Sequence, residues 1–176
     1  MSLSLQSDLG LQQGVLVVMG KSEMLQGYMV GCTRHIDDLY DGSRPAHAIP
    51  DSEAAQRNIE GALAEKVVAK HFGVYWSGAL GNKRAKDVGG AQVRSTPLPS
   101  GHLIVHRSDP PDDPFVLVCG CGPRFWIRGW ILGRDAQAER YWKTEMGKHQ
   151  LRSPAFFVPQ HELAPIDSLQ LPWSCH

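Results

Sequence analysis

Apolar and polar positions follow two different rhythms along the first part of this chain. The run from Gly14 to Met19 is apolar and has the length of a single strand. From Glu23 to Tyr40 the apolar side chains instead recur at helical spacing, and Ser22 precedes them as a candidate N-cap. The recurring residues are Leu25, Met29, Cys32, Ile36 and Leu39. This pattern predicts a strand followed by a long helix.

A second helix is predicted from Asp51 or Ser52 to about Phe72, where Gly73 gives a C-terminal signal. On a helical wheel one stripe collects small and apolar residues, namely Gly61, Ala64, Val68 and Phe72. Glu65 falls on the same stripe, where a carboxylate is costly unless it has a partner. Two interpretations stay open at this stage. Glu65 lies at the margin of the stripe and reaches water, or it points toward a site on an adjacent sheet.

The remainder of the chain reads mainly as short strands: residues 91–96, 102–106, 115–119, 124–132 and 155–158. Residues 135–146 predict a modest helix, and a short helix or turn begins at Gln160. The order of elements predicts an α/β chain of the α+β kind, with helices packed on a mixed sheet. We expect residues 91–96 to be a central strand under the second helix.

A single domain is expected over residues 1–176. Within it, residues 1–50 form an N-terminal strand and helix extension, 51–165 the main core, and 166–176 a tail. The 18 basic residues balance the 18 acidic ones, which argues against a protein that coats polyanions in general. No apolar run approaches the roughly 20 residues that a membrane span needs, and no secretory signal is visible. Buried thiols and a cytoplasmic location are expected, because Cys119-Gly120-Cys121 is not a C-x-x-C motif.

The segment around Asp87 carries the best candidate chemistry. Asp87 ends a basic loop, and two glycines allow a sharp turn before the strand. Gln92 and Arg94 are two residues apart, so on a strand they share one face while Val93 points into the core. An acid, an oxygen ligand and a cation thus come together, as Mg²⁺ and a scissile phosphate require.

These residues resemble the signature of the PD-(D/E)XK nucleases. Asp87 matches the Asp of that signature, Gln92-Val93-Arg94 stands at its acid-x-Lys, and Gly61-Ala-Leu-Ala-Glu65 is similar to the helix that supplies a further Glu. The resemblance implies a restriction-endonuclease-like core and hydrolysis of DNA phosphodiesters with Mg²⁺ or Mn²⁺. Glu65, Asp87 and Gln92 would then be the metal ligands, with Glu60 as an alternative to Glu65.

A wider likeness, over most of the chain after about residue 23, is to uncharacterised proteins of phages and bacteria. This wider likeness brings no known activity with it; together with the nuclease signature, it leads to the expectation of a role on DNA in phage or mobile-element biology. Two departures from the signature favour an alternative, a catalytically silent module that binds nucleic acid or a host protein. Gln92 brings no charge to a metal, and Arg94 cannot act as a base because its guanidinium stays protonated. In that alternative Asp87 caps a turn and Arg94 pairs with Glu65 or Asp87.

Two groups of basic residues are candidates for binding nucleic acid: Lys83, Arg84 and Lys86 beside Asp87, and Arg124 and Arg128 on a later predicted strand. Arg124, Trp126 and Arg128 alternate along one predicted strand, where they would grip phosphates and stack a base. The competing interpretation is a solvated sheet face on which Trp126 packs under the arginine stems. An enzyme built on Cys119 or Cys121 is disfavoured, because no His stands nearby in the sequence to activate the thiol.

Overall fold

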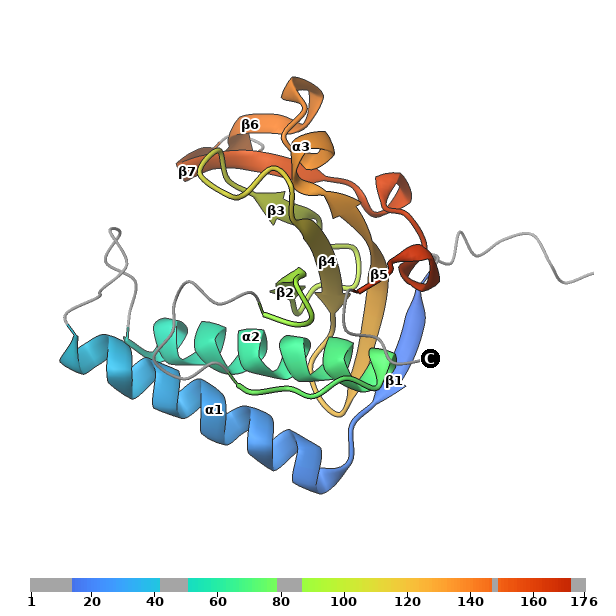
Figure 1. Cartoon of the computed structure of the whole chain (residues 1–176). Coiled ribbons are helices and arrows are strands. Elements are labelled where there is room, and N and C mark those ends of the chain that lie inside the picture. The colour runs from blue at the N-terminus through green and yellow to red at the C-terminus, as the bar shows by residue number, and fades with distance from the viewer. Residues whose placement is uncertain (1–13, 42–50, 79–86, 147–148, 172–176) are drawn as a thin grey trace, which may run out of the picture.

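The computed structural model describes residues 14–41, 51–78, 87–146 and 149–171. Two long helices, α1 (Lys21–Tyr40) and α2 (Asp51–Phe72), run side by side along one border of the molecule (Figure 1). A four-stranded mixed sheet rises from them in the order β1-β5-β4-β2. Its strands are β1 (Val15–Val18), β2 (Gln92–Thr96), β4 (Pro114–Cys119) and β5 (Arg124–Leu132). The α+β class with helices on a mixed sheet is therefore confirmed.

A second sheet lies on the far side of the first from the helices (Figure 1). It is antiparallel, in the order β3-β7-β6, and consists of β3 (Leu103–Val105), β6 (Trp142–Met146) and β7 (His149–Val158). Short helices fill the connections: α3 (Gly133–Ala136) and three 3₁₀ turns, at Glu139–Tyr141, Gln160–Glu162 and Ile166–Ser168.

Strand β4 separates two hydrophobic cores, which explains why its sequence is continuously apolar. Val116 and Val118 face α2 in the first core, whereas Phe115 and Leu117 face the second sheet in the other core. A strand covered on both faces has no solvent side, so apolar and polar residues do not alternate along it.

The two helices approach closely through glycines. A Cβ atom on Gly31 would lie 2.4 Å from the Cα atom of Ile59, and one on Gly27 would lie 2.4 Å from a methyl carbon of Leu63. Gly27 and Gly31 are accordingly the buried residues of α1. The face of α1 that packs on α2 is thus its small face, and the apolar stripe predicted from the sequence points elsewhere.

Three expectations about secondary structure were wrong. Residues 91–96 do form a strand packed on α2, but β2 is the edge strand next to β4, to which it is parallel. Residues 135–146 do not form one helix. They end α3, make a 3₁₀ turn and then form β6, because pairing with β7 outweighs local helix propensity. The N-cap of α1 is Gly20, whose N–H donates to Oε2 of Glu23 at 2.6 Å.

The first and last elements of the described part belong to the same architecture as its middle. The predicted extension supplies β1, which pairs antiparallel with β5 in the main sheet. Ile166, Leu169 and Leu171, expected in the tail, are buried in the first core instead. In the described part of the chain no helix is both long and apolar enough to span a membrane.

Candidate functional site

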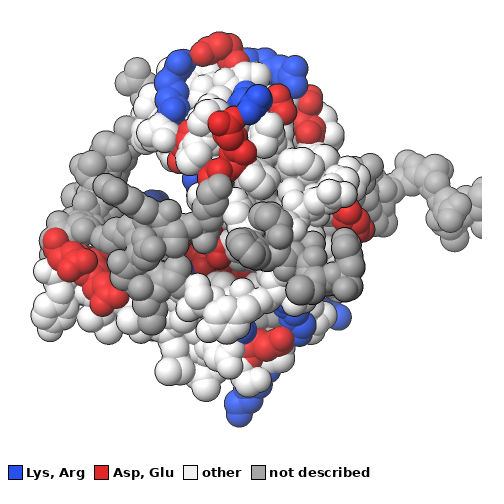
Figure 2. Space-filling view, in the orientation of Figure 1, with Lys and Arg blue, Asp and Glu red and all other residues white. Residues whose placement is uncertain are grey.

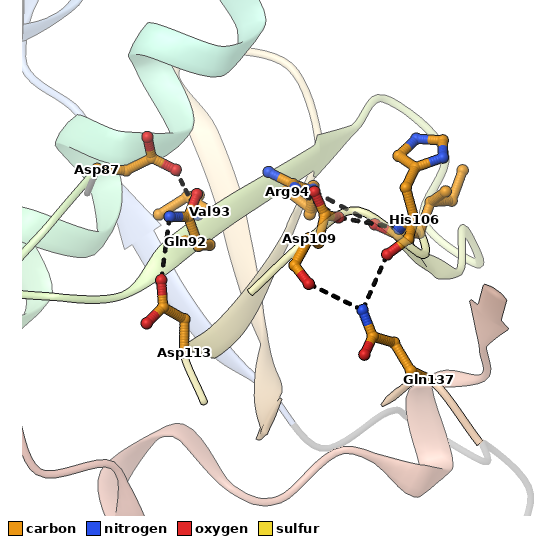
Figure 3. A network of polar contacts seen from close by, with 9 residues as sticks. Asp87, Gln92, Val93, Arg94, His106, Asp109, Asp113 and Gln137 are labelled. Carbon is orange, nitrogen blue, oxygen red and sulfur yellow. Dashed lines mark hydrogen bonds and ion pairs between the residues drawn. The ribbon is translucent and has the colours of Figure 1, made fainter. Parts of the chain in front are cut away.

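Asp87 lies in a tight turn immediately before β2. Gly89 and Gly90 both have positive φ angles, 53° and 97°, which L side chains rarely adopt. Val88 and Ala91 bridge across the turn, and Oδ2 of Asp87 accepts the backbone N–H of Val93 at 2.7 Å (Figure 3). The predicted sharp turn and the capping role of Asp87 are both present.

The environment of Asp87 opposes its ionisation. Burial raises the pKa of this carboxyl to about 6, and the charge of Glu65 adds to the rise. The Val93 hydrogen bond and the cations Arg94 and Arg34 act in the other direction. Glu65, Arg34 and Arg94 are therefore near enough to Asp87 to affect its charge.

Glu65 is buried, with 5% of its surface exposed, so the interpretation in which it reaches water was wrong. Its partner is Arg34 of α1, whose two terminal nitrogens donate to the two carboxylate oxygens at 2.6 and 2.7 Å. The indole N–H of Trp76 donates to Oε2 of Glu65 at 3.0 Å, and Arg34 also binds the carbonyl of Gly78 at 2.6 Å. Glu60, the alternative ligand, is half-buried on α2 and accepts a hydrogen bond from the side-chain amide of Gln56 at 2.8 Å.

Gln92 and Arg94 extend from β2 on the face opposite Val93, toward the second sheet (Figure 3). The amide nitrogen of Gln92 lies 3.4 Å from Oδ2 of Asp113. Asp113 is buried, and it precedes β4 at the end where that strand pairs with β2.

Arg94 pairs with Asp109 at 2.9 Å, and neither with Glu65 nor with Asp87 as the sequence suggested. Its guanidinium also lies over the ring of Phe115, 5.0 Å from the centroid. Asp109 is itself fixed, since Oδ2 accepts the backbone N–H of His106 and its carbonyl accepts the amide of Gln137. The cation is thus held in a network shown in Figure 3.

The four predicted site residues therefore surround the start of β2 but divide between two faces of the sheet. Glu65 and Asp87 belong to the helix side, and Gln92 and Arg94 to the other. Oxygen donors of this kind suit Mg²⁺. Within the described ranges, however, no three His, Cys, Asp or Glu side chains gather closely enough to hold a metal ion. The chemistry of the donors fits a divalent cation, whereas their arrangement does not form a ready site.

Among the candidate nucleic-acid contacts, Lys83, Arg84 and Lys86 lie outside the described residues. Arg124 is exposed, whereas Arg128 is only 5% exposed, so its prediction as a surface contact was wrong. A register shift between β4 and β5 falls next to Arg128 and breaks the alternation along the strand. Its guanidinium lies over the ring of Trp126 and donates to the carbonyl of Pro99.

Sequence reasoning missed several residues of this region. Arg34 is the most important, and the signal for it was the unexplained carboxylate of Glu65, which required a cation. Asp109 and Asp113 lie in the proline-rich segment before β4, and both act as partners of the β2 side chains. Among the thiols, Cys119 is buried as expected, but Cys32 and Cys121 are exposed.

Comparison with known proteins adds no assignment. No family model, no curated protein and no solved structure matches this chain.

Proposed function

We propose that this chain is a nuclease-like protein of the PD-(D/E)XK kind, with a restriction-endonuclease-like core, acting on DNA in phage or mobile-element biology. Its expected cofactor is Mg²⁺ or Mn²⁺, and its expected location is the cytoplasm of a bacterial cell. One observation carries the proposal. Glu65 from α2 and Asp87 from the turn before β2 lie close enough for their charges to interact. Arg34 and Arg94 both act on the carboxyl of Asp87.

Asp87 has a property that hydrolysis can use. A carboxyl with a pKa of about 6 is ionised at neutral pH but is more basic than an ordinary Asp. Such a group is suited to accept a proton from an attacking water molecule. Oδ2 accepts the backbone N–H of Val93, so we assign the proton-accepting role to Oδ1.

The missing charge at Gln92 has a neighbour able to replace it. Asp113 is buried beside the Gln92 amide, immediately before β4, the strand that pairs directly with β2. A carboxylate from this position would restore the acid that the signature has at position 92. Arg94 would hold a phosphate rather than activate water, since it cannot release its proton.

A second candidate is the silent module that binds nucleic acid or a host protein. It is favoured by the internal contacts of the four residues. Arg34 occupies both oxygens of Glu65, and Asp109 occupies the guanidinium of Arg94. While these ion pairs are intact, the charges of Glu65 and Arg94 are not available to a metal ion or a phosphate. The silent module would bind its ligand through other residues on its surface.

A cleavage assay separates the two candidates. Single- and double-stranded DNA and RNA are incubated with the chain in Mg²⁺, Mn²⁺ or a chelator. The nuclease predicts metal-dependent cleavage that Asp87→Asn reduces at least about a hundredfold, since the amide cannot accept a proton. Asp112→Ala is the control. It removes an exposed acid from the segment between β3 and β4 and should retain activity.

The variant Gln92→Glu should increase cleavage or metal affinity, because it restores a ligand charge. Cleavage that survives Asp87→Asn would refute this site. Absence of cleavage on every substrate, with no gain from Gln92→Glu, would support the silent module. Binding would then weaken when Arg124 or a loop lysine is replaced, and with salt if the partner is nucleic acid.

A further inference from the structure

Helix α1 carries an apolar seam on its exposed surface. The seam consists of Leu25, Met29, Cys32, Ile36 and Leu39, which follow one another at intervals of four, three, four and three residues. The four apolar side chains are 42–61% exposed, and Cys32 is exposed as well. An average interval of 3.5 residues is the spacing at which one helix packs along another. The occupant that this spacing fits is therefore a helix.

The seam is not the face that α1 uses within the chain. Gly27 and Gly31 make the close approach to α2, and Arg34 on the same side binds Glu65. The inner face of α1 is thus already engaged by small residues and one ion pair. The outer face keeps its apolar side chains in contact with solvent.

The exposed area is near what a stable interface needs. Tyr28 and Tyr40 flank the seam at 45% and 89% exposure. Because a large aromatic side chain covers roughly 150–250 Å² and an aliphatic one somewhat less, seam and tyrosines together expose on the order of 600 Å² of side chain. A standard interface buries about 800 Å² per partner. Figure 2 shows uncharged surface on the lower left of the molecule, where α1 lies, between acidic residues at the left and charged residues at the bottom.

Charge and symmetry identify the occupant and its direction. Between Leu25 and Leu39 the other positions bordering the seam, Gln26, Thr33 and His35, carry no fixed charge, so an identical helix meets no repulsion there. The two ends of the seam are equidistant from Cys32, with Leu25 seven residues before it and Leu39 seven after, while Met29 lies three before and Ile36 four after. We propose that α1 packs antiparallel against α1 of a second copy of this chain, with Cys32 near the two-fold axis.

The antiparallel direction follows from the charges at the helix ends. Lys21 lies at the start of α1, whereas Asp37 and Asp41 lie at its end without a basic residue in the last turn. An antiparallel pair places each Lys21 beside the acidic end of its partner and opposes the two helix dipoles. A parallel pair would bring like charges together.

Light scattering after size exclusion and sedimentation equilibrium test the association on the full chain. We expect twice the mass of one chain at high micromolar concentration, dissociating on dilution. Met29→Lys and Ile36→Lys should each raise the dissociation constant at least about tenfold. Leu98→Lys is the matched control, because Leu98 is 62% exposed and Met29 is 61% exposed, yet Leu98 lies outside the seam.

A short bismaleimide tests the direction in chains that each carry one cysteine, at position 25, 32 or 39, with every remaining cysteine replaced by serine. Cys32 should link to Cys32 of the partner. A Leu25→Cys chain mixed with a Leu39→Cys chain should also link, whereas Leu25→Cys alone should not, because the two copies of that residue would be about 21 Å apart along the axis.

A monomer at every concentration, or a dimer that Met29→Lys and Ile36→Lys leave intact, would overturn the proposal. Efficient linking of Leu25→Cys to itself would overturn the antiparallel arrangement. The readout is mass and proximity, so it does not depend on nuclease activity.

Discussion

The ion pair between Arg34 and Glu65 allows a quantitative prediction about stability. The perturbation is Arg34→Met, which keeps much of the side-chain volume but removes the cation. Both partners are largely removed from solvent, with side-chain exposures of 20% for Arg34 and 7% for Glu65. Of the hydrogen bonds to Glu65 from described residues given above, the variant keeps the one from the indole of Trp76 to the buried carboxylate.

The expected cost follows from the geometry. Two charges about 4 Å apart attract by roughly 4 kcal/mol at the effective dielectric constant near a protein surface. Breaking a buried pair by removing one partner costs about 3–5 kcal/mol, because the other charge stays buried. We expect Arg34→Met to lower the free energy of unfolding by about 3 kcal/mol, which corresponds to a fall in Tm of roughly 6–12 °C for a chain of this size.

The assay is urea unfolding at pH 7, with two controls. Arg134→Met removes the arginine of an exposed pair with Asp112, and an exposed pair contributes only about 0–1 kcal/mol. The double variant Arg34→Met/Glu65→Leu should recover much of the loss, because no unpaired charge remains buried. A loss below about 1 kcal/mol for Arg34→Met, equal to the Arg134→Met control, would refute the assignment of a desolvated pair.

Two further predictions concern Asp87 and the helix contact. The raised pKa of Asp87, about 6 against an ordinary 3.8, means that the folded state binds this proton more tightly than the unfolded state does. That contribution to stability is present below pH 4 and is lost as the pH rises toward and through 6. At pH 7 the free energy of unfolding of Asp87→Asn, measured in urea, should therefore exceed that of the original chain by about 1–3 kcal/mol. At pH 4 the two free energies should be equal. A difference that does not grow between pH 4 and 7 would contradict this explanation. Gly31→Ala should destabilise by about 1–3 kcal/mol, because its Cβ would meet the Ile59 backbone, whereas Gly61→Ala, with open space around it, should stabilise by about 0.5–1 kcal/mol. Equal melting temperatures for the two alanine variants would show that the close approach of the helices is not required.

The apolar stripe of α1 illustrates how far periodicity leads. Its spacing predicted a helix over residues 23–40, and α1 spans Lys21–Tyr40, since helical periodicity is a local property of the sequence. It did not reveal which face of that helix is buried. A stripe of this kind ordinarily faces the core, but the close contact through Gly27 and Gly31 turns the helix so that Leu25 and Met29 face outward.

The sequence by itself determined the two long helices, most of the strands and the tight turn that holds Asp87. These features depend on neighbouring residues, as when two glycines accept positive φ angles before a strand. The partners of the site side chains were decided only by the tertiary structure. Arg34 reaches Glu65 across 31 residues, and Asp113 meets Gln92 because β4 lies parallel to β2. Such pairings depend on how helices and strands pack, and packing combines burial, charge and chain connection over the whole domain, so no short segment specifies them.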